Sequence, residues 1–303
     1  AKQGGAKAVS KDVYQESNGG KWVRYDANGH MIKGWDTNDD GTYYFDLVTG
    51  AMTKGDATID GLPCSFDTVT GIGLNCAWKR INGKDYWYEG GKRQGYDPNN
   101  AAYRGKEIYD PASNGWYWLD NVQQGAKTVS KDVYQESEAG DWAENADGTG
   151  KWVRYDANGH MVKGEDCQNG KWYYFEPVTG AMVKGPWTLP DGRKVYYDPK
   201  TGIMQYGSVA VNNQLYYFDP VYGKMASGTP GNFWYTIDGK SYWYENWVRQ
   251  GWQPSNANYR GKEIYDPASG AWYWLDSVQQ GAKAVSKEVY QDSNGGKWVR
   301  YDA

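Results

Sequence analysis

Histidine and cysteine, two residues common in catalytic and metal sites, are scarce in this chain. Its 303 residues include two His and three Cys. His30 and His160 occupy the same place in two copies of one repeated segment, which indicates a role in a turn. No Ser/His/Asp spacing, zinc signature or phosphate-binding loop is present. We therefore expect that the protein is not an enzyme.

Long apolar runs and an excess of one charge are also missing. The mean hydropathy is -0.87, and no apolar run is long enough to cross a membrane. The 33 basic and 37 acidic residues leave a net charge of -4, without the basic tract that a phosphate backbone attracts. We expect neither membrane insertion nor a nucleic-acid partner. Because the sequence begins and ends inside repeated segments, we also expect a fragment of a longer protein.

The chain is instead rich in residues that form turns and in aromatic residues with a polar group. It has 40 Gly, 17 Trp and 28 Tyr, but only 5 Phe. Trp and Tyr each carry a polar group that needs a partner when it is buried. This composition favours many small clusters of half-buried rings over one deep core.

Two repeat lengths organise the sequence. The long repeat begins with GAK-x-VSK-x-VYQ at Gly5, Gly125 and Gly281. Within it, KWVRYDANGHM occurs at Lys21 and again at Lys151. These copies predict a first array at 1–124, a second at 125–280 and the start of a third at 281–303, joined in one continuous solenoid.

The short repeat is roughly 20 residues long, the lower end of the range for repeat architectures. YYFDLVTGAMTKG at Tyr43 and YYFEPVTGAMVKG at Tyr173 show its plan: an aromatic strand, an acid, a turn, a short second strand and a closing Gly. Alternating large residues bounded by Gly, Asn and Asp are typical of strands, and Thr-Gly and Asn-Gly steps supply the positive φ of tight turns. One such hairpin is marginal alone, so its neighbours must stabilise it. The sequence predicts an all-β fold, an elongated solenoid of stacked β-hairpin repeats.

The pattern aromatic–YYF–D–x–x–TG–x–M–x–x–G resembles the cell-wall-binding repeats of Gram-positive bacteria. This group includes choline-binding repeats and the glucan-binding repeats of glucansucrases. The match extends over nearly the whole chain and is strongest at Gly164–Gly185. The resemblance implies a β-hairpin solenoid with ligand pockets between consecutive hairpins. It also implies a secreted or cell-surface protein that is anchored to the wall or holds carbohydrate.

Alternation along the strands selects the residues that would line these pockets. Successive side chains of a strand point to opposite faces, so in KWYYFE Trp172 shares one face with Tyr174 and Tyr173 shares the other with Phe175. The resemblance to the family implies that the Phe face packs inside. For Trp22–Arg24 and Trp152–Arg154, we expect packing between hairpins. By the family pattern, the candidate ligand-binding residues are Trp116, Trp118, Trp272, Trp274, Trp87, Trp243, Trp172, Tyr174, Trp35 and Trp252.

The residues argue against choline and for a glycan or another wall polymer. A quaternary ammonium prefers a cage of aromatic rings, which the family builds from a Gly-Trp step and the Trp before YYF. Here Trp35 has the Gly-Trp step, but Thr42 stands in the second Trp position; Trp172 fills that position, but Glu165 replaces the first Trp. We therefore expect a non-catalytic module that binds carbohydrate, neutral or acidic, or cell-wall polymer. Two alternatives stay open: a spacer that presents another domain, and an adhesin segment that binds a host or bacterial surface protein.

One acidic stretch is a weak candidate for a metal site. DTNDDG places Asp36, Asn38 and Asp40 at alternate positions, as in the first half of a calcium loop. The match fails where a bidentate Glu is needed, because Leu47 stands there. A turn is the main interpretation, calcium is the alternative, and we expect no other cofactor.

The cysteines allow one disulfide. Cys64 and Cys76 flank the turn of CSFDTVTGIGLNC, so we expect them to lie opposite each other on paired strands. A cross-strand bridge is plausible in an exported protein. Cys167 is then left over.

Overall fold

The structure, a computed structural model, describes residues 5–17, 19–136, 150–212, 214–219, 223–225, 232–292 and 296–302. These residues form short antiparallel strands and two single-turn 3₁₀ helices, η1 (Asn121–Gln123) and η2 (Ser277–Gln279). The predicted all-β class is confirmed. In the described part of the chain, no helix is long and apolar enough to span a membrane.

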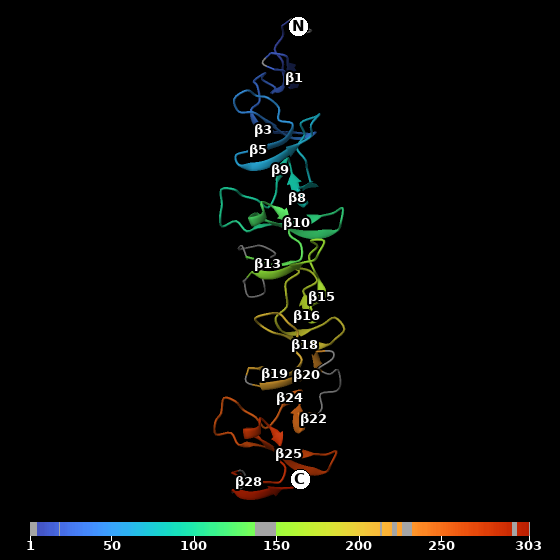
Figure 1. Cartoon of the computed structure of the whole chain (residues 1–303), viewed down its shortest axis with the longest axis vertical. Coiled ribbons are helices and arrows are strands. Elements are labelled where there is room, and N and C mark those ends of the chain that lie inside the picture. Colours follow the sequence, from blue (N-terminus) through green and yellow to red (C-terminus); the bar gives the residue numbers. More distant parts are fainter. Residues whose placement is uncertain are drawn as a thin grey trace. The chain divides into compact units, whose positions relative to one another are not determined.

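The chain divides into two compact units, Ala1–Val162 and Lys163–Ala303. The array boundaries expected from the sequence copies divide the chain differently and stay a prediction. Within each unit, one antiparallel hairpin follows another along the chain, as the succession of arrows in Figure 1 shows.

The described part of the first unit contains six hairpins. Their strands pair in perfect antiparallel register, and most tips carry two to five residues. The hairpins are β1 (Lys11–Gln15) with β2 (Lys21–Tyr25), β3 (Gly34–Asn38) with β4 (Gly41–Phe45), β5 (Gly55–Ile59) with β6 (Leu62–Phe66), β7 (Ala77–Ile81) with β8 (Lys84–Glu89), β10 (Gly105–Asp110) with β11 (Gly115–Asp120), and β13 (Lys131–Gln135) with β14 (Lys151–Tyr155); β9 (Lys92–Arg93) and β12 (Ala126–Lys127) are short additions.

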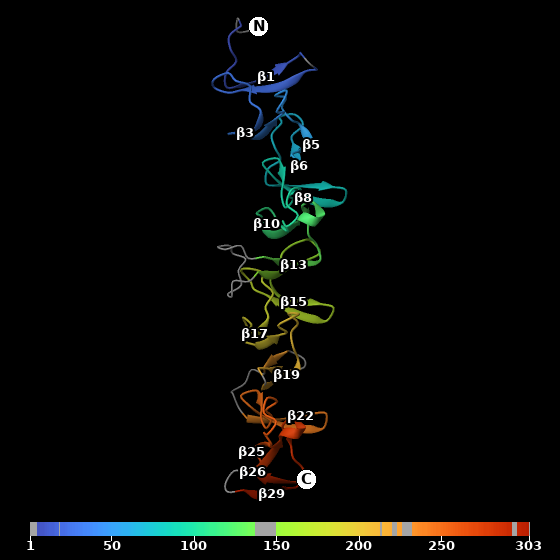
Figure 2. The same ribbon diagram turned by 90° about the vertical axis from the view of Figure 1, so that its left-hand side faces the viewer.

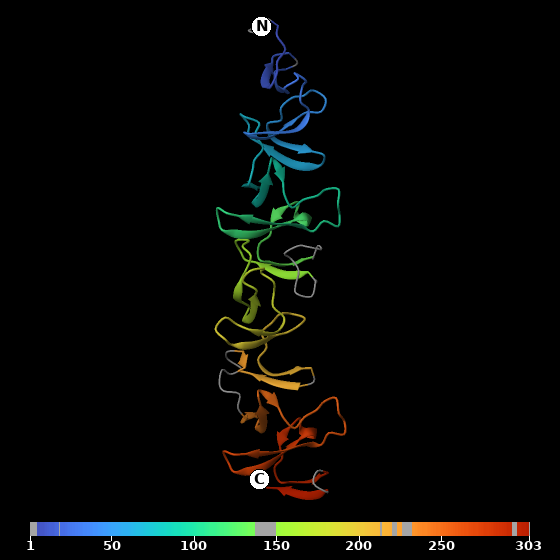
Figure 3. The same ribbon diagram turned by 180° about the vertical axis from the view of Figure 1, so that it is seen from behind.

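The second unit repeats this plan (Figure 2 and Figure 3). One sheet, β19-β20-β24-β23-β27-β26-β25, closely resembles β5-β6-β9-β8-β12-β11-β10 of the first unit. The strands are β15 (Gly164–Gln168), β16 (Lys171–Phe175), β17 (Gly185–Thr188), β18 (Lys194–Tyr197), β19 (Gly207–Val211), β20 (Gln214–Phe218), β21 (Lys224–Met225), β22 (Asn232–Ile237), β23 (Lys240–Glu245), β24 (Val248–Arg249), β25 (Gly261–Asp266), β26 (Ala271–Asp276), β27 (Ala282–Lys283), β28 (Lys287–Gln291) and β29 (Lys297–Tyr301).

A single residue after the turn of a short repeat joins consecutive hairpins. Met52 forms a β-bridge with Phe45 of its own hairpin, and its N–H donates to the carbonyl of Trp22 in the preceding hairpin at 2.7 Å. Met204 does the same between Tyr197 and the carbonyl of Trp172, at 2.8 Å. Each hairpin therefore stabilises the edge of the one before it, which a hairpin of this size requires.

The repeated Thr-Gly step is explained by the same joint. Gly50 has φ +69, and a Cβ there would lie 2.9 Å from the Cγ of Met31, which belongs to the preceding repeat. Gly71 has φ +76 and would meet the Cγ of Met52 at the same distance. Only glycine allows both the left-handed turn and the contact with the methionine of the previous joint.

The core consists of small aromatic clusters at the joints, as the composition predicts. Trp118, Val133, Val153 and Tyr155 form one of them, between the β10–β11 and β13–β14 hairpins. Phe45 and Phe175 are fully buried, which confirms that the Phe face of the YYF strands packs inside.

The expected position of the cysteines is wrong. Cys64 lies on β6 opposite Ala57 and Lys92, because β9 occupies the edge of β6 where the chain carrying Cys76 was expected. All three cysteines are free thiols: Cys64 is buried, whereas Cys76 and Cys167 are exposed. Burial raises the pKa of the Cys64 thiol to about 11.

A buried hydrogen-bonded triad ties two hairpins of the first unit together. The hydroxyl of Tyr155 donates to Glu107 Oε1 at 2.8 Å, and Gln135 Nε2 donates to the same oxygen at 2.7 Å. Gln135 Nε2 also lies 3.0 Å from the Tyr155 hydroxyl. Burial, and next the charge of Glu107, raise the pKa of Tyr155 well above its ordinary value. Tyr301, Glu263 and Gln291 repeat the triad in the second unit.

We predict that Tyr155→Phe destabilises the protein by about 1–3 kcal/mol, because it leaves buried acceptor capacity on Glu107 unused. Tyr25→Phe is the matched control, since the Tyr25 hydroxyl is hydrogen-bonded to Gln15 in a half-buried position without a carboxylate. Urea unfolding followed by circular dichroism measures both. Equal stability of the two variants would contradict the role given to the triad.

Alkaline pH should weaken the fold. Burial raises the pKa of Tyr155 and Tyr301, so these phenols stay protonated in the folded state while the unfolded chain loses the protons near pH about 10. The folded state then binds more protons, and its stability is complete below that pH and falls as the pH rises above it. Urea midpoints on both sides of pH 10 test this, and Tyr155→Phe should show a shallower decline. A midpoint that rises with pH would contradict the prediction.

Candidate functional site

Five of the predicted ligand-binding rings lie in the core. The exposed fractions are 3% for Trp87, 2% for Trp243, 8% for Trp118, 7% for Trp274 and 3% for Tyr174. Trp87 packs edge-on against Trp78 with ring centroids 5.0 Å apart. Rings this deeply packed offer no free face to a ligand in this conformation.

Two further predicted rings are half-buried. Trp35 lies against Tyr44, with ring centroids 5.1 Å apart, and Lys92 Nζ stands 4.3 Å from the Trp35 ring centre. Its face is thus already used by a cation of the chain. Trp252 is half-buried in the segment that follows β24.

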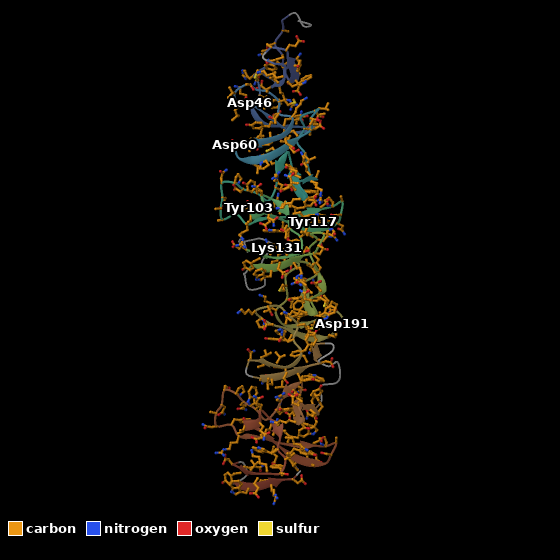
Figure 4. The ribbon with its side chains drawn as sticks, viewed as in Figure 1. Asp46, Asp60, Tyr103, Tyr117, Lys131 and Asp191 are labelled. Atoms are coloured by element: carbon orange, nitrogen blue, oxygen red, sulfur yellow. The ribbon has the colours of Figure 1, made fainter. Side chains whose placement is uncertain are left out.

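The remaining three predicted rings are exposed near hairpin tips. The exposed fractions are 39% for Trp116, 60% for Trp272 and 40% for Trp172. On β11, which also carries Trp116, Tyr117 points to the core. Its ring centroid lies 5.0 Å from that of Trp78, and Figure 4 labels Tyr117.

The exposed tryptophans belong to a repeated surface feature that the sequence interpretation missed. In five hairpins of the described chain, a Trp near the tip lies directly opposite a Tyr on the partner strand. We call these the Tyr–Trp pairs: Tyr14–Trp22, Tyr109–Trp116, Tyr134–Trp152, Tyr265–Trp272 and Tyr290–Trp298.

The geometry of the Tyr–Trp pairs is almost constant. Ring centroids lie 5.2 Å apart at Tyr109–Trp116 and 5.5 Å apart at Tyr14–Trp22, with interplanar angles of 45° and 55°. The two rings of each pair are therefore in contact and inclined to each other, an arrangement that we call a V. The tryptophans are between 39% and 72% exposed, so a large part of each tryptophan is open to solvent.

At two hairpin tips, a glycine leaves room for the tyrosine of the pair. A Cβ at Gly20 would come within 2.9 Å of Tyr14 Cζ, and one at Gly296 within 3.0 Å of Tyr290 Cζ. Tyr109 is positioned by a hydrogen bond, because its hydroxyl donates to Asn114 Oδ1 at 2.5 Å. Tyr14, Tyr109 and Tyr290 therefore rest against the tips of their own hairpins in the free protein.

The expected packing role of Trp22 and Trp152 is wrong. Their rings are 42% and 41% exposed, and the buried member of each Trp–Arg set is the arginine. Arg24 donates to Asp12 at 2.6 and 3.0 Å, and its guanidinium carbon lies 4.0 Å from the centre of the Tyr43 ring. The bond to Asp12 holds the pKa of Arg24 above its ordinary value, against the opposing effect of burial.

Position along the strand, and not the strand face alone, decides which rings are free. Trp116 and Trp118 share one face of β11, but the next hairpin covers Trp118 through Val133 and Tyr155. The residue at the base of the hairpin is buried and the one near the tip is exposed. Sequence alternation identifies the face but not how far the neighbouring hairpin overlaps it.

At the same position, other hairpins carry polar side chains. Thr37 and Thr42 face each other with hydroxyl oxygens 3.2 Å apart, and Arg80 is paired with Asp85 at 3.1 Å. A hairpin can therefore form without a Tyr–Trp pair. The β15–β16 hairpin has the tryptophan of such a pair without the tyrosine, because Trp172 lies opposite Cys167.

The residues of the calcium hypothesis make hydrogen bonds within the first two hairpins. Asp36 accepts from Arg24 at 2.9 Å, and Asn38 Oδ1 accepts from the backbone N–H of Asp40 at 3.0 Å and of Gly41 at 3.2 Å. Within the described ranges, no three His, Cys, Asp or Glu side chains gather as metal ligands would. Calcium binding stays an untested hypothesis.

The fold and the exposed aromatic tips define a class of protein, the β-hairpin repeat proteins. Comparison with known families confirms the resemblance drawn from the sequence: residues 148–187 and 183–229 match the choline-binding repeat. The matched stretch, residues 148–229, is about a quarter of the chain.

One curated relative and two solved structures extend the comparison. Glucosyltransferase-S of Streptococcus mutans is 26% identical over an alignment covering 66% of this chain and 18% of that protein, so the chain spans less than a fifth of this relative. Choline binding protein F of Streptococcus pneumoniae, solved with ipratropium, has a TM-score of 0.57 at 20% identity and covers 95% of this chain and 99% of its own. CbpJ of the same species has a TM-score of 0.55 at 20% identity, with 95% and 100% covered. The two structures are similar to this chain in fold.

We predict that Trp118→Ala and Trp116→Ala have very different effects although the residues share one strand face. Trp118→Ala empties a packed joint and should cost about 3–5 kcal/mol. Trp116→Ala removes a partly exposed ring that contacts Tyr109 and should cost less than about 1.5 kcal/mol. Urea unfolding of both variants measures the difference, and a larger cost for Trp116→Ala would contradict the placement of the two rings.

Proposed function

We propose that the chain is a non-catalytic module that binds carbohydrate or cell-wall polymer as part of a secreted or cell-surface protein. The observation that carries this proposal is the repetition of exposed Tyr–Trp pairs at hairpin tips. Flat aromatic rings stack on the apolar faces of sugars, and a ring that is already exposed pays no cost in core packing when it binds.

Exposure of large rings argues for a ligand because the hairpins do not need it for folding. Thr37 and Thr42 occupy the same tip position in a hairpin of equal register. Apolar rings kept at the surface in several repeats indicate an interaction site.

We also propose that the hairpins continue as one elongated solenoid. The joint formed by Met52, Phe45 and the Trp22 carbonyl is local and uses only neighbouring hairpins, so it can be repeated without limit. Such an arrangement would distribute weak sugar contacts along a rod, and several weak contacts to one polymer give high avidity.

The relatives support a role beside other domains. The curated relative carries the name of a glucosyltransferase, and this chain corresponds to 18% of it. We propose that the chain likewise serves as the binding part of a larger protein, and that any catalytic activity lies outside it.

Binding to purified Gram-positive cell walls and to insoluble glucan tests this function. We expect the double variant Trp116→Ala/Trp272→Ala to bind about tenfold more weakly in co-sedimentation, a change of about 1.4 kcal/mol. Val122→Ala/Val278→Ala is the control, because these valines are 88% and 87% exposed and lie outside the pairs. Failure of the unaltered protein to bind any wall or glycan would overturn the proposal in favour of a spacer.

A further inference from the structure

We propose that four Tyr–Trp pairs are individual binding sites for the apolar face of an uncharged pyranose ring: Tyr14–Trp22, Tyr109–Trp116, Tyr134–Trp152 and Tyr265–Trp272. This inference rests on the proposed carbohydrate-binding function and makes it specific. It assigns the site to the hairpin tip and selects neutral over acidic glycans.

The two rings of a pair act together. At Tyr265–Trp272 the centroids are 5.3 Å apart and the planes meet at 47°, with the rings 47% and 60% exposed. A sugar placed in this V contacts both rings, whereas a lone tryptophan offers one face. At two other pairs the tyrosine is placed before binding, because Tyr14 rests against Gly20 and Tyr109 donates to Asn114, which lowers the entropy lost on binding.

Charged side chains next to two of the pairs are neutralised inside the protein. Beside Tyr14–Trp22, Arg24 is held by Asp12 and by Asp36 at 2.6 and 2.9 Å. Beside Tyr134–Trp152, Arg154 donates to Asp132 at 2.7 and 2.9 Å. These guanidinium groups are committed to internal carboxylates and do not offer a free fork to an acidic sugar.

The other two pairs lie beside carboxylates that accept hydrogen bonds from uncharged groups and keep their negative charge, which disfavours an acidic sugar. Glu107 is two residues from Tyr109 on the same strand face, and it accepts from Tyr155 and Gln135. Glu263 stands in the same relation to Tyr265 and accepts from Tyr301 and Gln291 at 2.7 Å. Each of the four sites is thus an aromatic V with its strand neighbours paired internally, a surface that suits an uncharged ring.

Lys54 lies near the first pair. Lys54 Nζ is 5.8 Å from the centre of the Trp22 ring, and it donates a hydrogen bond to the carbonyl of Val69. The fifth pair, Tyr290–Trp298, lies beside the exposed Arg300 and is therefore left outside the proposal.

The hairpin of β15 and β16 contains half of such a site. Trp172 is 40% exposed and lies opposite Cys167 instead of a tyrosine. Gly170 precedes Lys171 as Gly20 precedes Lys21, with φ of +73 and +75, but nothing lies within 4 Å of a Cβ at Gly170. The space that Tyr14 fills above Gly20 is empty above Gly170, so Cys167→Tyr should complete a V at this tip.

The test uses fluorine NMR of the whole chain labelled with 5-fluorotryptophan, with resonances assigned by single Trp→Phe changes. The probes are an isomalto-oligosaccharide, which is neutral, an oligogalacturonate, which carries a carboxylate on each ring, and soluble fragments of a Gram-positive cell wall. We expect the neutral sugar to shift the resonances of Trp22, Trp116, Trp152 and Trp272 and to leave those of Trp87 and Trp118 in place. Cys167→Tyr should strengthen the response of Trp172 severalfold, whereas Cys167→Thr, which imitates the Thr37 position, should not.

The outcomes separate the two proposals. If sugar or wall fragments shift other tryptophans while the four named ones stay unchanged, or if oligogalacturonate binds more tightly than the neutral sugar, the tip sites are wrong and the binding function stands. An unchanged Trp172 response in Cys167→Tyr would contradict the cooperation of the two rings. If neither these sugars nor wall fragments shift any resonance, the binding function itself fails, and the tip sites fail with it.

Discussion

The structure depends on one constraint: a hairpin of five-residue strands cannot stabilise itself and must be covered by the segment that follows it. The bridging residue meets this need by pairing with its own hairpin and donating to the one before, as Met52 does between Phe45 and Trp22. Gly71 of the next Thr-Gly step lets the following turn pack on Met52, and Gly50 and Gly202 lie in the same way against Met31 and Met182. Because the joint uses main-chain groups and one flexible side chain, the rest of the strand is free to vary.

The limited overlap between hairpins also explains why the rings at the hairpin tips are exposed. The covering segment reaches the base of each strand and buries Trp118 or Arg24 there, but it does not reach the tip. A large ring at the tip is consequently held by a folded strand and exposed at the same time. The same geometry accommodates Thr37 and Thr42, so tip residues can change with function while the base residues maintain the fold.

Much of the fold could be predicted from the sequence, because YYF alternation and Thr-Gly turns are local signals. The buried position of Phe45 and Phe175 followed from the resemblance to the family, because alternation alone does not say which face is buried. The site was predictable only in part: Trp116 and Trp272 are exposed as expected, but Trp118 and Trp274 are buried. The sequence of a strand does not show how much of it another hairpin covers. Tyr14 and its equivalents were missed because cross-strand partners depend on the register. The prediction that Cys76 lies opposite Cys64 was wrong for a related reason, since β9, which comes later in the chain, pairs with β6 at Cys64.

The central claim is that tip rings are contact surfaces and base rings are core. Hydroxyl-radical footprinting with mass spectrometry, in the presence and absence of a bound cell-wall polymer, tests it most directly. The account predicts rapid oxidation of Trp22, Trp116, Trp152 and Trp272 in the free protein, protection of these rings by the polymer, and slow oxidation of Trp87, Trp118 and Trp243 in both states. Protection confined to the base rings, with tip oxidation unchanged by a bound polymer, would contradict it.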